Sequence, residues 1–232
     1  MTFETQGITR KYFDGFSFLT RCIDNTDFTR KFMSVINIET INDTVSCVTT
    51  DGRAMHVVEY KKDDFPLDDG IYEVKVNVKN TIVIDKVNEN DYGHYPNWKR
   101  IVKSAEENIN VIGNYCLTFN DLKNKTKTHS FYELIFILNN LGYCFNHLYL
   151  QSIALMNRSW DIMLNPYVIG SVMKFVSENH FAFIMPYTKE TLIYDTNNAF
   201  EILDKTLKSV SDKSELFDIR SVVRRKKYLW EE

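Results

Sequence analysis

The chain has 232 residues, with 28 Lys and Arg against 31 Asp and Glu, and a formal net charge of −3. Hydrophobic residues make up 44% and charged residues 25%, which excludes a disordered or collagen-like chain. No stretch approaches the roughly 20 apolar residues of a membrane helix, and the first residues show no secretory signal pattern. We therefore expect a cytoplasmic protein with no membrane partner.

The first half of the chain predicts a helix followed by hairpin-linked strands. Residues 8–22 form the helix, because Phe13, Phe16 and either Leu19 or Thr20 recur at helical spacing. Residues 31–40, 44–50 and 53–60 predict three strands, separated by the turn signals at 41–43 and at Asp51-Gly52. Residues 71–78 alternate strictly and predict another strand, and residues 81–87 predict a further strand or one short helix.

The second half repeats this style after a polar stretch at residues 103–108. We expect strands at 109–113, 115–120, 131–138, 160–164, 168–176 and 180–185, and a helix at 147–157. Residues 192–194 favour one more strand, and residues 199–210 have helical spacing. The predicted fold class is α+β, mostly antiparallel sheet with few helices, because the strands come in hairpin-linked runs. The predicted domains are 1–105 and 106–186, followed by a C-terminal extension, 187–232.

Motifs for catalysis are absent from the sequence. It contains no phosphate-binding glycine loop, no HExxH, no GxSxG and no calcium-loop spacing. The five histidines are isolated, and the four cysteines form no CxxC pair, so we predict no metal site, no cofactor and reduced thiols. The paired carboxylates at 63–64 and 68–69 follow two lysines in a polar loop, which favours a solvated loop over an acid/base pair. An enzymatic reading therefore has no positive support.

Three stretches, in order along the chain, resemble the bacterial DNA polymerase sliding clamp, the beta subunit of the replicase. VTTDGRAM (48–55) is similar to the "ATDGHRLA" turn of the clamp's middle domain, and RKFMSVINIE (30–39) is similar to the strand before it. YPNWKRIV (95–102) is similar to "FPDYRRVL" near the end of that domain. GYCFNHLYL (142–150) and FIMP (183–186) are similar to "FNxxYL" and the terminal "VMPM" of the last domain. The resemblance covers residues 8–186.

This resemblance implies a polymerase processivity factor. Sliding clamps are rings of six similar domains that encircle duplex DNA and tether a polymerase or other replication proteins, and a clamp loader can open them. Two clamp-like domains per chain imply a homotrimer of the phage or mobile-element type, closed by head-to-tail contacts. The ring holds DNA through lysines and arginines on its inner wall, independently of DNA sequence. The candidate DNA-facing residues are Arg10, Lys11, Arg21, Lys99, Arg100 and Arg158.

The resemblance also implies a groove that binds a short linear motif of client proteins. Methionine and aromatic side chains adapt to an apolar anchor, while arginine or threonine can fix the peptide backbone. For the methionines alone, ordinary core positions are the alternative reading. The positions that match the groove are Arg30, Met33, Thr50, Arg53, Met55, Tyr149, Val168, Phe183, Met185 and Pro186.

The chain departs from the family pattern in its helices. Only residues 77–87 stand where the family has a second helix of its middle domain, and no clear first helix precedes Tyr115 in the second half. Two alternatives therefore stay open. One is a clamp-fold adaptor that binds client peptides without encircling DNA. The other is an unrelated α+β enzyme acting on a small molecule.

Overall fold

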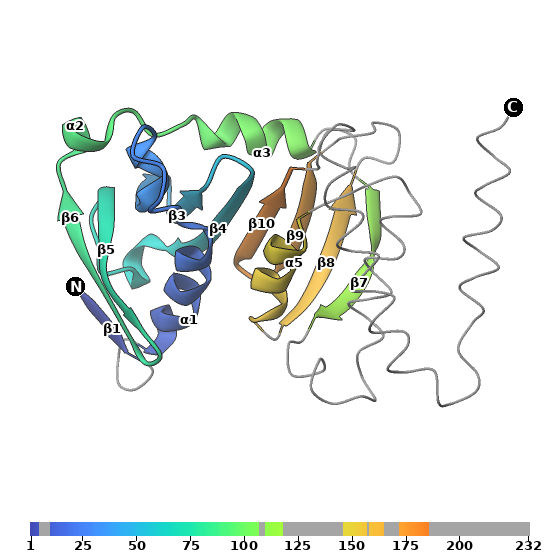
Figure 1. The fold of residues 1–232 in the computed structure, drawn as a ribbon. Coiled ribbons are helices and arrows are strands. Elements are labelled where there is room, and N and C mark those ends of the chain that lie inside the picture. Colours follow the sequence, from blue (N-terminus) through green and yellow to red (C-terminus); the bar gives the residue numbers. More distant parts are fainter. Residues whose placement is uncertain (5–9, 107–109, 118–145, 157, 165–171, 186–232) are drawn as a thin grey trace, which may run out of the picture. The chain divides into compact units, whose positions relative to one another are not determined.

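The computed structural model describes residues 1–4, 10–106, 110–117, 146–156, 158–164 and 172–185 (Figure 1). All of them belong to one compact unit, Met1–Thr188. The strands predicted at 131–138 and 192–194 and the helix predicted at 199–210 lie outside the described residues. In the part of the chain that is described, no helix is long and apolar enough to cross a membrane.

The elements alternate between hairpin-linked strands and short helices. Those of the first half are β1 (Thr2–Glu4), α1 (Arg10–Leu19), η1 (Thr20–Cys22), η2 (Lys31–Ser34), β2 (Val35–Ile41), β3 (Thr44–Thr50), β4 (Ala54–Lys61), η3 (Lys62–Asp64), β5 (Gly70–Val78), β6 (Thr81–Val87), α2 (Glu89–Tyr92) and α3 (Trp98–Glu106). Those of the second half are β7 (Asn110–Leu117), α5 (His147–Ala154), β8 (Arg158–Leu164), β9 (Met173–Ser177) and β10 (His180–Ile184).

The strands form one sheet in the order β1-β6-β5-β2-β3-β4-β10-β9-β8-β7, and every neighbouring pair is antiparallel. The two halves of the sequence meet where β4 pairs with β10, with a register from Val58↔His180 to Ala54↔Ile184. We call this ladder the seam. The predicted α+β fold class is confirmed. The predicted boundary between residues 105 and 106 falls at the end of α3 and stays a prediction.

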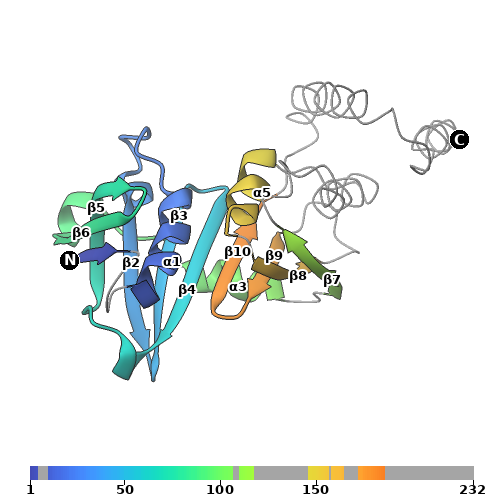
Figure 2. The ribbon, with the colours of Figure 1, turned by 90° about the horizontal axis from the view of Figure 1, so that it is seen from below.

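Alternate residues of the strands divide the buried side chains into two groups, one on each face of the sheet. The α1-side core joins Phe16 and Phe18 of α1 and Ile153 of α5 to strand residues such as Val58 and Ala182. The opposite face carries a smaller group, the α3-side cluster, in which α3 covers the seam strands (Figure 2). Its buried members are Val48, Met55, Val57, Trp98, Ala105 and Phe183.

Most predicted elements are confirmed within a few residues. The turn at Asn42 is confirmed, and its φ of 55° lies in the left-handed region that asparagine tolerates. The helix predicted from residue 8 is described from Arg10, with Tyr12, Phe16 and Leu19 buried. Residues 81–87 form a strand, β6, which settles that alternative.

Three predictions of local structure were wrong. The strand predicted from Lys31 begins only at Val35, because the chain first makes a 3-10 turn, η2, in which the Met33 N–H donates to the Arg30 carbonyl. The described parts of the strands predicted at 109–113 and 115–120 form one strand, β7 (Asn110–Leu117), with an irregularity between Val111 and Gly113. Residues 98–106, for which no helix was predicted, form α3, whose Trp98 and Ala105 are buried against the sheet.

Candidate peptide-binding and DNA-facing surfaces

The turn between β3 and β4 is fixed by its own side chains. The Thr50 hydroxyl donates to the Ala54 carbonyl at 2.7 Å and accepts from the Gly52 N–H at 3.0 Å. The Asp51 carboxylate accepts from the N–H groups of Arg53 and Ala54 at 2.8 and 2.7 Å. Gly52 has φ of +83°, a conformation that L side chains rarely adopt. The sequence TDGR thus folds into one defined turn, in which the Asp51 N–H donates to the Ala54 carbonyl at 3.3 Å and Gly52 and Arg53 are the central residues.

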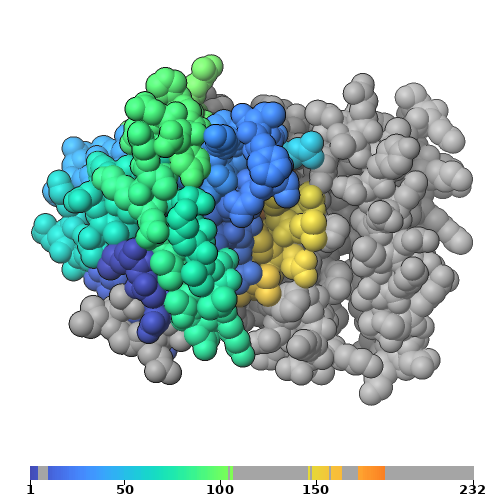
Figure 3. Space-filling view, turned by 60° about the vertical axis from the view of Figure 1, so that its left-hand side comes forward, coloured from blue at the N-terminus to red at the C-terminus, as the bar shows by residue number. Residues whose placement is uncertain are grey.

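Two distant segments contact this turn. A Cβ atom added to Gly52 would lie 2.6 Å from Met33 Cε and 3.3 Å from the Arg30 guanidinium, so a side chain at Gly52 would collide with the segment before β2. The surface view shows that segment beside the turn (Figure 3). From the other end of the chain, the Met185 N–H donates to the Arg53 carbonyl at 2.8 Å. The structure therefore brings three of the sequence stretches together at one point.

From the β3–β4 turn, a row of side chains on three neighbouring strands extends across the seam. Thr50, Met55 and Phe183 are register partners on β3, β4 and β10. We call the set at this place the turn cluster; its members are Arg30, Met33, Thr50, Gly52, Arg53, Met55, Phe183 and Met185.

Burial divides the turn cluster into two parts. Met33, Thr50, Met55 and Phe183 are at most 5% exposed, whereas Arg30 and Arg53 are exposed and Met185 is 44% exposed. The buried residues belong to the interior in this conformation, as the core reading of the methionines holds. The exposed members of the turn cluster, which offer an open surface to a partner, are Arg30, Gly52, Arg53 and Met185.

Of the remaining groove candidates, only Tyr149 is among the described residues, and it does not belong to the turn cluster. Tyr149 lies on α5 and packs against the α1-side core, on the opposite face of the sheet from Phe183. Val168 and Pro186 lie outside the described residues.

Sequence reasoning missed Lys174 of β9, the next member of the row. Lys174 is the register partner of Phe183, and its ammonium lies 5.4 and 5.6 Å from the ring centroids of Phe181 and Phe183. It pairs with Glu106 at the end of α3, and the whole residue is only 9% exposed. A single lysine in a strand gives no sequence signal for such a contact, which depends on the fold.

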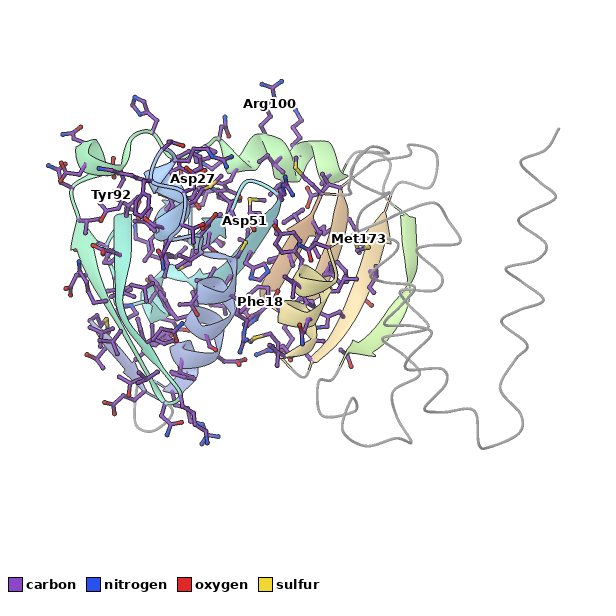
Figure 4. The ribbon with its side chains drawn as sticks, viewed as in Figure 1. Phe18, Asp27, Asp51, Tyr92, Arg100 and Met173 are labelled. Atoms are coloured by element: carbon purple, nitrogen blue, oxygen red, sulfur yellow. The ribbon has the colours of Figure 1, made fainter. Side chains whose placement is uncertain are left out.

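The DNA-facing candidates lie on two different faces. Arg10, Lys11 and Arg21 belong to α1 and to η1, which follows it, and Arg158 reaches α1 from β8 by pairing with Asp14. Lys99 and Arg100 belong to α3 on the other face, where Arg100 points away from the sheet (Figure 4). The structure therefore does not gather all six on one surface.

Ion pairs reduce the free positive charge on the α1 side. Lys11 lies 3.6 Å from the Asp64 carboxylate, and Arg158 also contacts Glu178 at 3.0 Å. On the described residues, Arg10 and Arg21 have no carboxylate within ion-pair distance. The sequence of α5 contains neither lysine nor arginine, and its Leu148 is 56% exposed.

The surface of the described residues carries two pockets. One, of about 470 Å³, is lined by Glu39, Asp69, Trp98 and their neighbours, and the other, of about 440 Å³, includes Phe28, Val87 and Tyr92. Neither is lined by a peptide-groove candidate. Among the described residues, no group of three His, Cys, Asp or Glu side chains could hold a metal ion.

Comparison with known proteins gives one kind of match. No family model and no curated protein matches the sequence. Among solved structures, the chain is similar to the DNA polymerase III beta subunits of Borrelia burgdorferi (TM-score 0.48, 13% identity) and Streptococcus pneumoniae (TM-score 0.49, 11% identity), each over 82% of this chain and 64% of theirs. It is also similar to the Helicobacter pylori beta clamp bound to a DNA ligase peptide, with a TM-score of 0.46 and 11% identity over 81% of this chain and 65% of that one.

The chain spans slightly less than two thirds of the length of these clamps, 64% for the first two. These solved structures are DNA polymerase sliding clamps, the family that the sequence motifs of this chain resemble.

Proposed function

We propose that this protein is a sliding-clamp-like processivity factor, which encircles duplex DNA and binds client proteins at the turn cluster. The observation that carries the proposal is the meeting of three sequence-distant stretches at the β3–β4 turn. Gly52 lies against Met33, and Met185 is bonded to Arg53. A site for a short linear motif needs apolar anchors beside a few groups that hold the peptide backbone, and this set contains both.

Client binding is tested with peptide selection from a random displayed library against the full-length protein. We expect enriched peptides to carry apolar residues and to lose most of their binding to Met185→Glu. The matched control is Leu148→Glu, because Leu148 is a comparably exposed apolar residue on the other face. Equal binding to both variants would remove the turn cluster as the client site.

The ring form predicts a homotrimer. Three chains of 27.3 kDa give about 82 kDa, and light scattering over a concentration series should show this mass forming. The outer edges of the described sheet are β1 and β7, and β1 has only three residues. A mass that stays at one chain at high concentration would contradict the ring.

Encirclement of DNA is tested with nicked circular DNA. We expect the protein to stay with the circle during gel filtration and to leave after the circle is cut, since only a ring slides off free ends. We assign the inner face of the ring to the α1 side, where Arg10 and Arg21 have no described carboxylate within ion-pair distance. Arg10→Glu/Arg21→Glu should therefore weaken retention, whereas Arg100→Glu/Lys103→Glu on α3 should not. Greater loss with the α3 pair would contradict the assignment of the inner face.

A second candidate is a clamp-fold adaptor that binds clients without encircling DNA. The neutralised Lys11 and Arg158 and the exposed Leu148 on α5 favour it, because an inner wall for DNA needs net positive charge. An adaptor would bind the selected peptides at the turn cluster but would not be retained on nicked circular DNA.

A further inference from the structure

Helix α3 lies across the seam on the face opposite α1. Its Trp98 and Ala105 are buried against Val48, Met55 and Phe183, and Ile101 and Val102 are partly buried in the same cluster. Met55 and Phe183 of the turn cluster are members of this same cluster and are only 2% and 3% exposed. The α3-side cluster is much smaller than the α1-side core, so α3 is held by few apolar contacts.

Polar contacts hold α3 at its two ends. At the first end, Glu39 of β2 accepts from the Trp98 indole N–H at 3.2 Å and from the Lys99 ammonium at 2.6 Å. At the last end, Glu106 pairs with Lys174 of β9. Since β3, β4 and β10 lie between β2 and β9, the two attachments stand on opposite sides of the seam.

A nine-residue helix does not persist by itself in water, because helices shorter than about 12 residues are marginal. Its folded state therefore depends on these end contacts and on the small cluster beneath it. Segments with few buried contacts open locally at a lower free-energy cost than the core.

We propose that α3 is a displaceable cover over Met55 and Phe183, held shut by Glu39 at one end and Lys174 at the other. The inference rests on the proposed function, since the surface that α3 covers is part of the proposed client site. Opening of α3 exposes Met55 and Phe183, and closing leaves Arg30, Gly52, Arg53 and Met185 as the exposed members of the turn cluster. The cover thereby regulates access of client peptides.

Cysteine labelling of the full chain tests the cover without any client or DNA. In Met55→Cys, the new thiol lies beneath α3, while native Cys47 on β3 is fully buried in the α1-side core and serves as an internal reference. Cleavage after Arg53 puts the two thiols in separate tryptic peptides, so mass spectrometry follows both during alkylation by iodoacetamide. We expect the thiol at position 55 to react at least tenfold faster than Cys47.

A second set of variants tests the attachment. Lys174→Met keeps an apolar side chain against Phe181 and Phe183 but removes the ion pair, so labelling at position 55 should become several-fold faster with Cys47 unchanged. Lys75→Met is the matched control, because it removes an exposed lysine paired with Glu73 away from α3. Val57→Cys, in the same cluster, replaces Met55→Cys if that variant does not fold.

Equal labelling rates at position 55 and at Cys47 would mean that both thiols are exposed only by global unfolding. That result would overturn the proposal that α3 is a displaceable cover. So would an unchanged rate at position 55 in Lys174→Met. Because no client takes part, these results are independent of the peptide-selection experiment, and the cover and the proposed function can fail separately.

Discussion

At the scale of single residues, Gly15 decides how closely α1 approaches β4. A Cβ atom at Gly15 would overlap the Tyr60 hydroxyl oxygen and lie 3.1 Å from Val58 Cγ1. The buried Tyr60 hydroxyl has no hydrogen-bond partner on the described residues, so it fills space without a polar contact. Helix propensity alone favours alanine over glycine by about 1 kcal/mol, but this contact opposes it.

We expect Gly15→Ala to lower the free energy of unfolding by about 1–3 kcal/mol, because the added methyl group overpacks the interface. The measurement is urea unfolding followed by circular dichroism. Adding Tyr60→Phe removes the overlapping oxygen and should restore most of the loss. If Gly15→Ala is instead more stable than the parent protein, the close approach of α1 is wrong.

Two buried histidines of the seam, His56 of β4 and His180 of β10, lie against Phe18 of α1. The His56 ring stacks on Phe18 with 4.0 Å between centroids, and its Nδ1 lies 2.9 Å from the Phe18 carbonyl oxygen. The His180 ring lies 5.4 Å from the same phenyl ring. Burial lowers the pKa of His56 to about 4 and, together with the charge of Arg158, lowers the pKa of His180 to about 4.

These lowered pKa values predict acid sensitivity. The contribution of the two histidines to the stability of the folded state is complete above about pH 6.5, where histidine is neutral in the unfolded chain as well. This contribution is lost as the pH falls toward 4, because the unfolded chain takes up protons first. Each histidine contributes about 3 kcal/mol over this range. His56→Asn, which does not titrate, should reduce the loss of unfolding free energy between pH 7.5 and pH 5, measured in urea. An undiminished loss would mean that carboxylates alone cause the acid sensitivity.

At the scale of elements, α3 is a helix that the sequence analysis does not predict. Its residues serve there only as the YPNWKRIV motif of the family resemblance, and their helical spacing is not used. Trp98, Ile101, Val102 and Ala105 recur every three or four residues, and that pattern was available in the sequence. The 3-10 turn at Lys31–Ser34 is harder to predict from the sequence. Phe32 and Ser34 continue the alternating pattern of β2, whereas in the structure Met33 is the buried residue. Packing against the β3–β4 turn determines the conformation of that segment, and the local sequence pattern does not specify this packing.

The first attachment of α3 makes a prediction at this scale. Glu39→Ala removes the acceptor for both Trp98 and Lys99, so the amides of α3 should exchange with deuterium faster while those of β3 do not. We expect a loss of about 1 kcal/mol in the free energy of unfolding. Glu89→Ala, an exposed carboxylate on α2, is the control and should change neither quantity. Unchanged exchange in α3 would show that the cluster beneath it suffices.

At the scale of the whole molecule, Arg158 connects the two halves of the sequence. It pairs with Asp14 of α1, 144 residues earlier in the chain, and with Glu178 at the turn between β9 and β10. The Arg158 side chain is 23% exposed and that of Asp14 is 49% exposed, so solvent screens the pair in part.

A double-mutant cycle of Asp14→Ala and Arg158→Ala should give a coupling energy of about 1 kcal/mol in urea unfolding. The comparison is the Lys11–Asp64 pair, whose side chains are 51% and 58% exposed and whose coupling should be smaller. Equal coupling in both cycles would contradict a special role of Arg158 between the halves.

The sequence allowed the fold class, most strands and the meeting of the TDGR turn with Met33 and Met185 to be predicted. The resemblance to the sliding clamp carried the last of these predictions, because no stretch specifies the contact by itself. The burial of Met55 agrees with the alternative reading of the methionines as core residues. The burial of Phe183, the row ending at Lys174 and the division of the basic residues between two faces were not predicted. Each of these depends on which strands become neighbours, and the β4–β10 pairing has no local signal.

The seam also has a consequence for the order of events during synthesis. Val58 of β4 pairs with His180, about 120 residues later in the chain. At a typical translation rate of about 5–20 residues per second, roughly 6–24 s pass between the synthesis of β4 and the synthesis of its partner strand β10. Throughout that interval β4 is an open edge, and such edges template pairing with other chains. Nascent chains stalled before β10 should therefore bind chaperones and self-associate, and release past Ile184 should end both.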